Sequence, residues 1–279
     1  MAYKSILTVL TDPKDVAKVL DAAVPFAAAC GGHLDVLCLG VDRTQTGYYF
    51  AGATALMHDE TIAHAQAEAT EIEAAVRLQL QRSDISWGVD AMVAQSASVA
   101  GLVARRARFA DLVILPKPYG EGQYADAPVV VEAAMFQGNA PAIVLAEGRP
   151  VPLKPKRVAV AWNESAEAMV SIRRALPILQ AADEVNICIV APERHSSESS
   201  DPGAELSRML SRHGVSVEVS ILAQTLPRVS EVIARHVADI DADLLVMGAY
   251  GHSRFREAIL GGATRNMLEH AKVPVFMAH

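Results

Sequence analysis

The sequence contains two copies of one pattern, and this internal repeat limits the folds that the chain can adopt. An apolar run at 5–10 (SILTVL) corresponds to a second run at 157–162 (RVAVAW), and a helical pattern follows each of them. Each helical pattern contains one proline, Pro25 and Pro177, which lie 152 positions apart, as do the starts of the two runs. Because a proline inside a helix removes a hydrogen bond, its recurrence at one position indicates duplication rather than accident.

The later parts of the two halves correspond as well. In each half, short apolar runs alternate with helical patterns, as in the βαβ units of a parallel sheet. Nearly continuous apolar strands are typical of a sheet that helices cover on both faces. The corresponding runs are 34–39 with 185–190, 89–95 with 217–224, 110–116 with 242–248, and 139–146 with 272–279.

The chain length and one proline-rich segment predict two domains. A chain of 279 residues has the length of two ordinary domains. The segment 147–156 (EGRPVPLKPK) has three prolines and several charges, which is typical of a linker. We therefore predict α/β domains at 1–148 and 154–279, each with a doubly wound parallel sheet.

The second half carries a series of glycines that the first half lacks. An apolar run ends at Gly248, Gly251 follows, and Gly261 and Gly262 precede Thr264 and a helical pattern. Glycine lets the backbone come close to a ligand, and the first N–H groups of a helix favour an anion. The spacing indicates two glycine turns that face one phosphate group. Two ordinary turns around a surface loop are the alternative.

The segment 244–268 (LLVMGAYGHSRFREAILGGATRNML) resembles the C-terminal signature of the universal stress protein family, written G-x2-G-x9-G-[S/T/N]. Gly248, Gly251 and Gly261 have the required spacing. The next position departs from the signature, because Gly262 stands where the family has a hydroxyl or amide residue. Thr264 stands where a second hydroxyl is usual. In ATP-binding members this segment holds the phosphates and the ribose, whereas other members bind no nucleotide.

The resemblance implies a fold and a function for the whole chain. The fold would be two tandem doubly wound domains of the adenine nucleotide alpha hydrolase type, related by a pseudo-twofold axis. Their final strands, 140–145 and 274–278, would pair with each other. The function would be binding of ATP or a related adenine nucleotide, with or without Mg²⁺, in the C-terminal domain during a stress response. The alternative is a nucleotide-free module for protein interaction or stress signalling.

The resemblance also implies the residues of the nucleotide site. Ligands of open parallel sheets bind beyond the carboxyl ends of the strands. Asn163 stands where the family often has Asp. Trp162 could instead pack between a strand and a helix. His252 could contact phosphate or simply be exposed to solvent. The predicted site residues are Ala161, Trp162, Asn163, Ala191, Met247, Gly248, Gly251, His252, Arg254, Gly261, Gly262, Ala263 and Thr264.

The first half is a degenerate copy. Pro116 and Tyr119 stand in the places of Gly248 and Gly251, so the first half is not expected to hold phosphate in the same manner. The segment 120–125 (GEGQYA) matches a dinucleotide fingerprint in its letters. It follows a late strand and has no clear helix start, so we do not interpret it as a nucleotide site.

The sequence offers no catalytic machinery and no metal site that we can assign. It has no P-loop, C-x-x-C, H-E-x-x-H or G-x-S-x-G motif, so no catalytic residue is named and weak ATP hydrolysis is the most we expect. A net charge of −7 gives no general attraction to nucleic acid or to an anionic membrane. Three cysteines with irregular spacing fit reduced thiols, so we expect a cytoplasmic protein. Protein partners stay unnamed, and a homodimer stays open.

Overall fold

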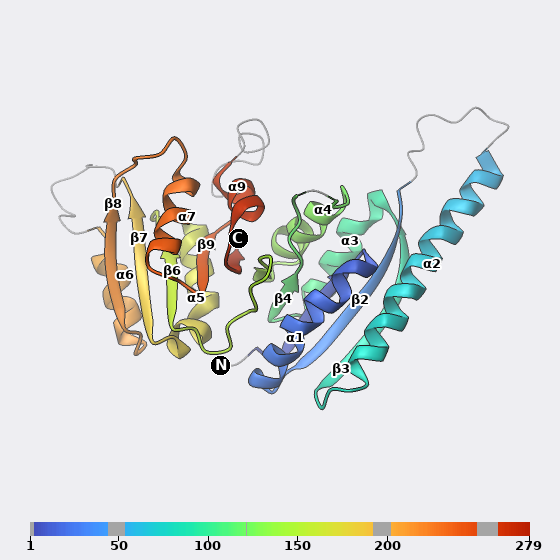
Figure 1. Ribbon diagram of the computed structural model, residues 1–279, viewed down its shortest axis with the longest axis horizontal. Helices are drawn as coiled ribbons and strands as arrows, with labels where there is room; N and C mark the ends of the chain where they lie inside the picture. Colours follow the sequence, from blue (N-terminus) through green and yellow to red (C-terminus); the bar gives the residue numbers. More distant parts are fainter. Residues whose placement is uncertain (1–2, 44–53, 121, 192–201, 250–261) are drawn as a thin grey trace. The chain divides into compact units, whose positions relative to one another are not determined.

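The computed structural model describes residues 3–43, 54–120, 122–191, 202–249 and 262–279. The chain divides into two compact units, Ala2–Ala140 and Pro141–His279. Each unit has the α/β construction that the repeat predicts, and each is described here by itself (Figure 1). No described helix combines the length and the apolar composition that a membrane span would need.

The unit Ala2–Ala140 is built on a parallel sheet with the strand order β3-β2-β1-β4. Helices α1 and α2 pack on one face of this sheet, and α3 and α4 on the other (Figure 1). The strands are β1 (Ser5–Leu10), β2 (His33–Asp42), β3 (Ser86–Gln95) and β4 (Leu112–Leu115). The helices are α1 (Val16–Cys30), α2 (Thr54–Leu80), α3 (Ser96–Ala107) and α4 (Ala127–Glu132), with short turns η1 (Pro13–Asp15) before α1 and η2 (Ala133–Gln137) after α4.

The unit Pro141–His279 has the strand order β5-β10-β9-β6-β7-β8. All neighbouring strands in it are parallel except β5 and β10. The strands are β5 (Ala142–Val144), β6 (Arg157–Ala161), β7 (Glu184–Val190), β8 (Val217–Leu222), β9 (Leu244–Gly248) and β10 (Val275–Ala278). The described helices are α5 (Ala166–Ala181), α6 (Ala204–Arg212), α7 (Val229–Asp239) and α9 (Ala263–His270).

The final strands of the two sequence halves pair as expected. In the antiparallel pair β5–β10, Ala142, Ile143 and Val144 lie opposite Met277, Phe276 and Val275. This pairing assigns the last strand of the first half to the unit that contains the second half. The division between the units therefore falls after Ala140, ahead of the proline-rich segment that suggested a linker. The domain bounds 1–148 and 154–279 stay a prediction.

The repeated prolines lie inside corresponding helices, Pro25 in α1 and Pro177 in α5. The sequence analysis missed α4. Helix α4 begins at Ala127, two residues after the segment 120–125, for which the sequence showed no clear helix start. The helix is only six residues long and continues into η2, so it offers too little periodicity to be recognised from the sequence.

One polar network, whose central side chain is buried, joins the sheet to α7. Asn186 on β7 is 1% exposed, and its side-chain oxygen lies 2.9 Å from Nε2 of His236 on α7. The amide nitrogen of Asn186 donates to Ser220 Oγ at 3.0 Å and to Glu218 at 3.3 Å. Because an amide oxygen only accepts, Nε2 of His236 carries the proton of this bond. Burial lowers the pKa of His236, although Asp239 and Glu218 oppose that shift.

The lowered pKa of His236 predicts a loss of stability in acid. Just below the ordinary pKa of 6.5, the unfolded chain binds a proton at His236 more readily than the folded chain does. The free energy of unfolding therefore decreases as the pH decreases through that range. In a His236→Gln variant, which keeps an N–H donor, we expect this slope to flatten. Denaturant titrations between pH 8 and the onset of acid unfolding measure it, with Trp87→Phe as background so that Trp162 reports on this unit. His213→Gln, at an exposed position, is the control, and an unchanged slope in His236→Gln would refute the assignment.

Candidate functional site

The predicted site residues of the second half gather at the carboxyl ends of β6, β7 and β9. Ala161, the last residue of β6, lies opposite Cys188 of β7 on one side and Met247 of β9 on the other. The next residue, Trp162, donates its backbone N–H to the carbonyl of Cys188 at 3.0 Å and is half-buried. Three parallel strands thus end side by side, at the kind of edge where open α/β sheets bind ligands.

Asn163 forms the turn that leads from β6 into α5. Its side-chain oxygen accepts the backbone N–H of Ser165 at 3.3 Å, and Ser165 in turn caps α5 by accepting from the N–H of Ala168 at 3.1 Å. Glu164 between them has φ 61, in the left-handed region. The Asn163 side chain is exposed, and its amide nitrogen has no partner among the described residues. The turn therefore leaves Asn163 with donors at this edge of the sheet.

Ala191 follows β7 and has an unusual backbone conformation. Its φ of 43 lies in the left-handed region, where a residue with a Cβ atom is uncommon. The backbone N–H of Ala191 donates to the carbonyl of Leu222 at 2.8 Å, which fixes this residue at the end of β7 and β8. Such strain often occurs at functional sites, because other contacts must hold it in place.

Gly248 is explained by packing. A Cβ atom on this residue would lie 2.5 Å from the backbone nitrogen of Ala168 and 2.8 Å from the carbonyl carbon of Glu167. Both atoms belong to the first turn of α5, which rests directly on the end of β9. Because strand side chains alternate between faces, Met247 points to the opposite side and is 7% exposed. Gly248 thus permits close contact between strand and helix, irrespective of any ligand.

The second glycine cluster opens a helix, as predicted. Gly262 is the N-cap residue of α9, which begins at Ala263, and as a glycine it has no side chain with which to cap this end. Ala263 is exposed, whereas Thr264 is 2% exposed and hence has a packed side chain. The first turn of α9 lies at the same end of the unit as the carboxyl end of β9 (Figure 1). Gly251, His252, Arg254 and Gly261 lie outside the described residues.

The thiol nearest to this edge is buried and protonated. Cys188 is 1% exposed, and burial raises its pKa to about 12. A thiol with so high a pKa is protonated at neutral pH and is a poor nucleophile. Within the described parts of the chain, no group of three or more His, Cys, Asp or Glu side chains is arranged to hold a metal ion.

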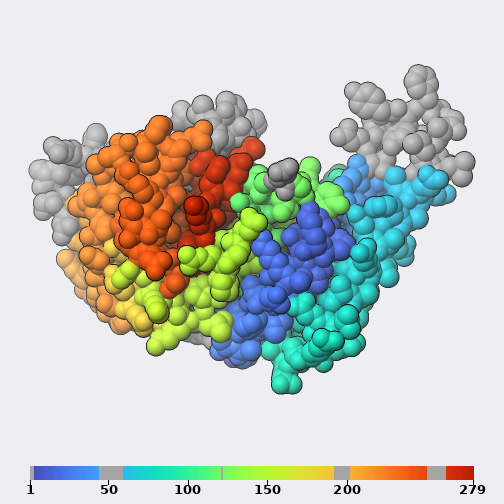
Figure 2. Space-filling model, viewed as in Figure 1, coloured from blue at the N-terminus to red at the C-terminus, as the bar shows by residue number. Residues whose placement is uncertain are grey.

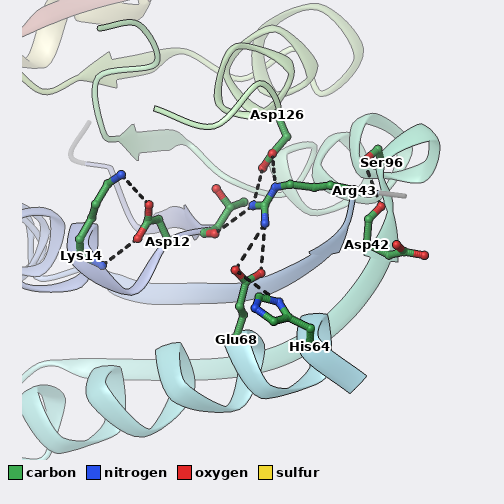
Figure 3. Close-up of polar contacts among 9 residues, drawn as sticks. Asp12, Lys14, Asp42, Arg43, His64, Glu68, Ser96 and Asp126 are labelled. Carbon is green, nitrogen blue, oxygen red and sulfur yellow. Dashed lines mark hydrogen bonds and ion pairs between the residues drawn. The ribbon is translucent and has the colours of Figure 1, made fainter. Parts of the chain in front are cut away.

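A cluster of charged side chains occupies the corresponding edge of the first unit, and the sequence analysis missed it. Arg43, the residue after β2, donates to Asp126 through Nε at 2.9 Å and to Glu68 of α2 through Nη1 at 3.1 Å (Figure 3). Its Nη2 lies 3.4 Å from the carbonyl oxygen of Thr11, the residue after β1. Asp126 and Glu68 are only 7% and 11% exposed in their side chains.

An aromatic ring completes this cluster. The guanidinium carbon of Arg43 lies 3.7 Å from the ring centre of Tyr124, within cation–π distance. Lys14 lies 5.4 Å from the same ring, pairs with Asp12 at 2.7 Å, and donates to the carbonyl of Gly122. We call the set Arg43, Glu68, Tyr124 and Asp126 the Arg43 cluster. It joins β2, α2 and the segment before α4.

The charges of the Arg43 cluster support one another. Burial by itself lowers the pKa of the Arg43 guanidinium, but the hydrogen bonds and charges of Asp126 and Glu68 raise it overall. The sequence repeat aligns Thr11 with Asn163, so Arg43 lies beside the first-half counterpart of a predicted site residue. The sequence signals for the Arg43 cluster were an arginine directly after a strand, Arg43, and two polar side chains in the segment before α4, Tyr124 and Asp126. None of these reveals a contact across 83 positions.

Comparison with known proteins shows which family part of the sequence matches and which known structures have a similar fold. Residues 154–279 match the sequence model of the universal stress protein family. A universal stress protein from Archaeoglobus fulgidus has a similar structure over 98% of this chain and 96% of its own, with a TM-score of 0.64 and 19% identity. A putative universal stress protein from Pseudomonas aeruginosa matches 99% of this chain and 93% of its own, with a TM-score of 0.63 and 16% identity.

Residues 154–279 thus have the sequence of a universal stress protein domain, and the whole length of the chain has the fold of the tandem, two-domain universal stress proteins. Among curated proteins, the universal stress protein Slr1230 from Synechocystis sp. is 37% identical over 68 residues. That similarity covers 24% of this chain, and the chain spans only 23% of the length of that relative.

Proposed function

We propose that this tandem universal stress protein binds ATP or a related adenine nucleotide in a C-terminal domain at 154–279 and acts in a stress response. The nucleotide would lie on the edge formed by Ala161, Trp162, Asn163 and Ala191, with its phosphates toward the glycine segment and the start of α9. The domain at 1–148 would bind none. We also propose a cytoplasmic location, since all three cysteines are free thiols.

The difference between the two carboxyl edges is the observation that carries this proposal. In the second unit, Asn163 is exposed and its amide nitrogen has no partner among the described residues, and the N-cap residue of α9 is Gly262, which has no side chain. The backbone N–H groups and the dipole of a helix start suit a phosphate. In the first unit, the Arg43 cluster fills the edge with its own ion pairs. The fit is incomplete, because Gly248 and Thr264 both have structural roles.

These two residues favour a second candidate function. If Gly248 serves packing and Thr264 is buried, only the segment around Gly251 and Gly261 remains specific to nucleotide. A module that binds other proteins and no nucleotide would keep the same packing. Isothermal titration with ATP, ADP and AMP, each with and without Mg²⁺, separates the two. Heat from none of the three nucleotides would favour the interaction module.

A pair of glycine substitutions tests the site itself. Gly261→Val should abolish nucleotide binding, because side-chain carbon would occupy the space that the phosphate needs. Gly262→Ser should tighten binding by about 0.5–1.5 kcal/mol, the range of one added hydrogen bond. Gly101→Val is the matched control, because Gly101 on α3 has open space around a Cβ atom. Equal nucleotide affinity in the wild type and in a folded Gly261→Val variant would refute the assigned site.

A further inference from the structure

A cavity of about 380 Å³ lies in the second unit between α7 and α9, over the amino-terminal end of β9. It is formed at the opposite end of β9 from the carboxyl edge described above, and it plays no part in the proposed nucleotide site. Figure 2 shows the surfaces of α7 (orange) and α9 (red) side by side. We call this space the α7–α9 cavity. Its volume is near the lower end of the range of small-molecule sites, roughly 300–1,000 Å³.

The floor of the α7–α9 cavity is apolar. Leu245 is fully buried, Met267 is 2% exposed, and Val237 and Val273 are each 6% exposed. No Phe, Tyr or Trp is among the residues that line it. The floor has no side-chain hydrogen-bonding group, so the part of a ligand that rests on it must be aliphatic or otherwise apolar.

The rim of the α7–α9 cavity is cationic. Three basic side chains, Arg149, Arg235 and Lys272, line it together with His270, against one carboxylate, Asp241. This local excess is the reverse of the net charge of −7 on the whole chain. All five side chains are exposed, and none of the three cations has an ion-pair partner among the described residues.

Two of the rim side chains have defined positions. Arg235 donates to Thr225 Oγ1 at 2.6 Å, which holds its guanidinium at the rim and leaves its other N–H groups available. Nδ1 of His270 bonds the carbonyl oxygen of Asn266 at 3.0 Å and therefore carries the proton. In this tautomer Nε2 can only accept a hydrogen bond, so His270 is not a donor for an anion. An anion at the rim could thus meet guanidinium and ammonium donors above an apolar floor.

We propose that the α7–α9 cavity binds a small amphipathic monocarboxylate, such as a medium-chain fatty acid. The alkyl chain would rest on Leu245, Met267 and Val273, and the carboxylate would bind Arg235 and Lys272. At roughly 30 Å³ for each water-sized group, the cavity has room for about a dozen non-hydrogen atoms. That is the size of decanoate. A nucleotide would place polar base and sugar atoms on a floor that cannot bond them.

Titration of the full chain with decanoate, below its micelle concentration, tests the proposal. Arg235→Gln and Lys272→Gln should each weaken decanoate about tenfold, the effect of losing one charge-assisted bond of about 1.4 kcal/mol. Ala238→Trp should block the cavity, because Ala238 lies at its exposed side on α7. Arg212→Gln on α6, which does not line the cavity, should bind as the wild type does.

Three outcomes would overturn the proposal. They are no binding of decanoate at millimolar concentration, equal binding of decyltrimethylammonium, or wild-type affinity in Arg235→Gln and Lys272→Gln. In the last case, the cations would only interact favourably with the carboxyl ends of α7 and α9 and would not bind a ligand. Titration of ATP into the same variants tests whether the two sites are separate. The variants of the α7–α9 cavity should bind nucleotide as the wild type does.

Discussion

A Gly40→Ala substitution should severely destabilise the first unit. Gly40 lies in β2, directly beneath α2, and a Cβ atom on it would overlap the carbonyl oxygen of Ala65 and lie 2.7 Å from its carbonyl carbon. Both are backbone atoms, so no side-chain rotation can relieve the overlap, and α2 must move away from the sheet. We expect a loss of about 3 kcal/mol or more, at the upper end of the cost of overpacking.

The expected damage extends to the Arg43 cluster, because α2 also carries Glu68. Fluorescence of Trp87 in a Trp162→Phe background measures unfolding of the first unit alone, since the chain has two tryptophans and each unit has one. Gly101→Ala is the control with the opposite sign. Gly101 lies within α3 with open space at its Cβ position, so alanine should stabilise by about 0.5–1 kcal/mol. A Gly40→Ala protein as stable as the wild type would show that α2 does not rest on β2 in this way.

Arg43→Met should be the most damaging change at the carboxyl edge of the first unit. It leaves Asp126 and Glu68 with buried charges and without the guanidinium, with only the exposed His64 3.9 Å from Glu68, while preserving part of the apolar contact with Tyr124. Removing one partner of a fully buried pair costs about 3–5 kcal/mol. The Arg43 side chain is 29% exposed, so solvent screens part of this, and we expect a loss of about 2–3 kcal/mol.

A neutral background distinguishes lost ion pairs from lost packing. Arg43→Met combined with Asp126→Asn and Glu68→Gln should recover much of the stability, since no unpaired charge then remains buried. Arg106→Met is the matched control. Arg106 pairs with Asp90 at 2.7 Å, but the two side chains are 43% and 58% exposed, so its loss should cost at most about 1 kcal/mol. If Arg43→Met and Arg106→Met reduced the free energy of unfolding equally, the buried ion pairs of the Arg43 cluster would contribute no more than an exposed pair.

The fold was largely predictable because its signals are local. Short apolar runs separated by helical patterns, and Pro25 and Pro177 at matching places, fix both the class and the duplication. The pairing of β5 with β10 was implied by the family resemblance and is confirmed. The extent of each unit was harder to predict. Strand β5 has only three residues, and the position of Pro141 at a unit boundary depends on a partner strand about 130 positions later.

The candidate site was predictable only in part. The sequence placed Ala161, Asn163 and Ala191 at strand ends, and the structure brings these ends to one edge. It could not reveal that Gly248 accommodates the first turn of α5, because that requirement arises from an atom 80 positions away in the sequence. The Arg43 cluster was missed for the same reason. Ion pairs between distant segments leave no periodic pattern in a single sequence.

The pairing of β5 with β10 has a consequence for how the protein behaves on dilution. Two separate chains that join through such strands must lose their independent translation and rotation, at an estimated cost of about 4–15 kcal/mol at 1 M standard state. Here both strands belong to one chain, so only loop closure opposes their pairing, and that cost grows slowly with length. The paired edge therefore does not depend on protein concentration. Even a cell with very few copies would keep it intact.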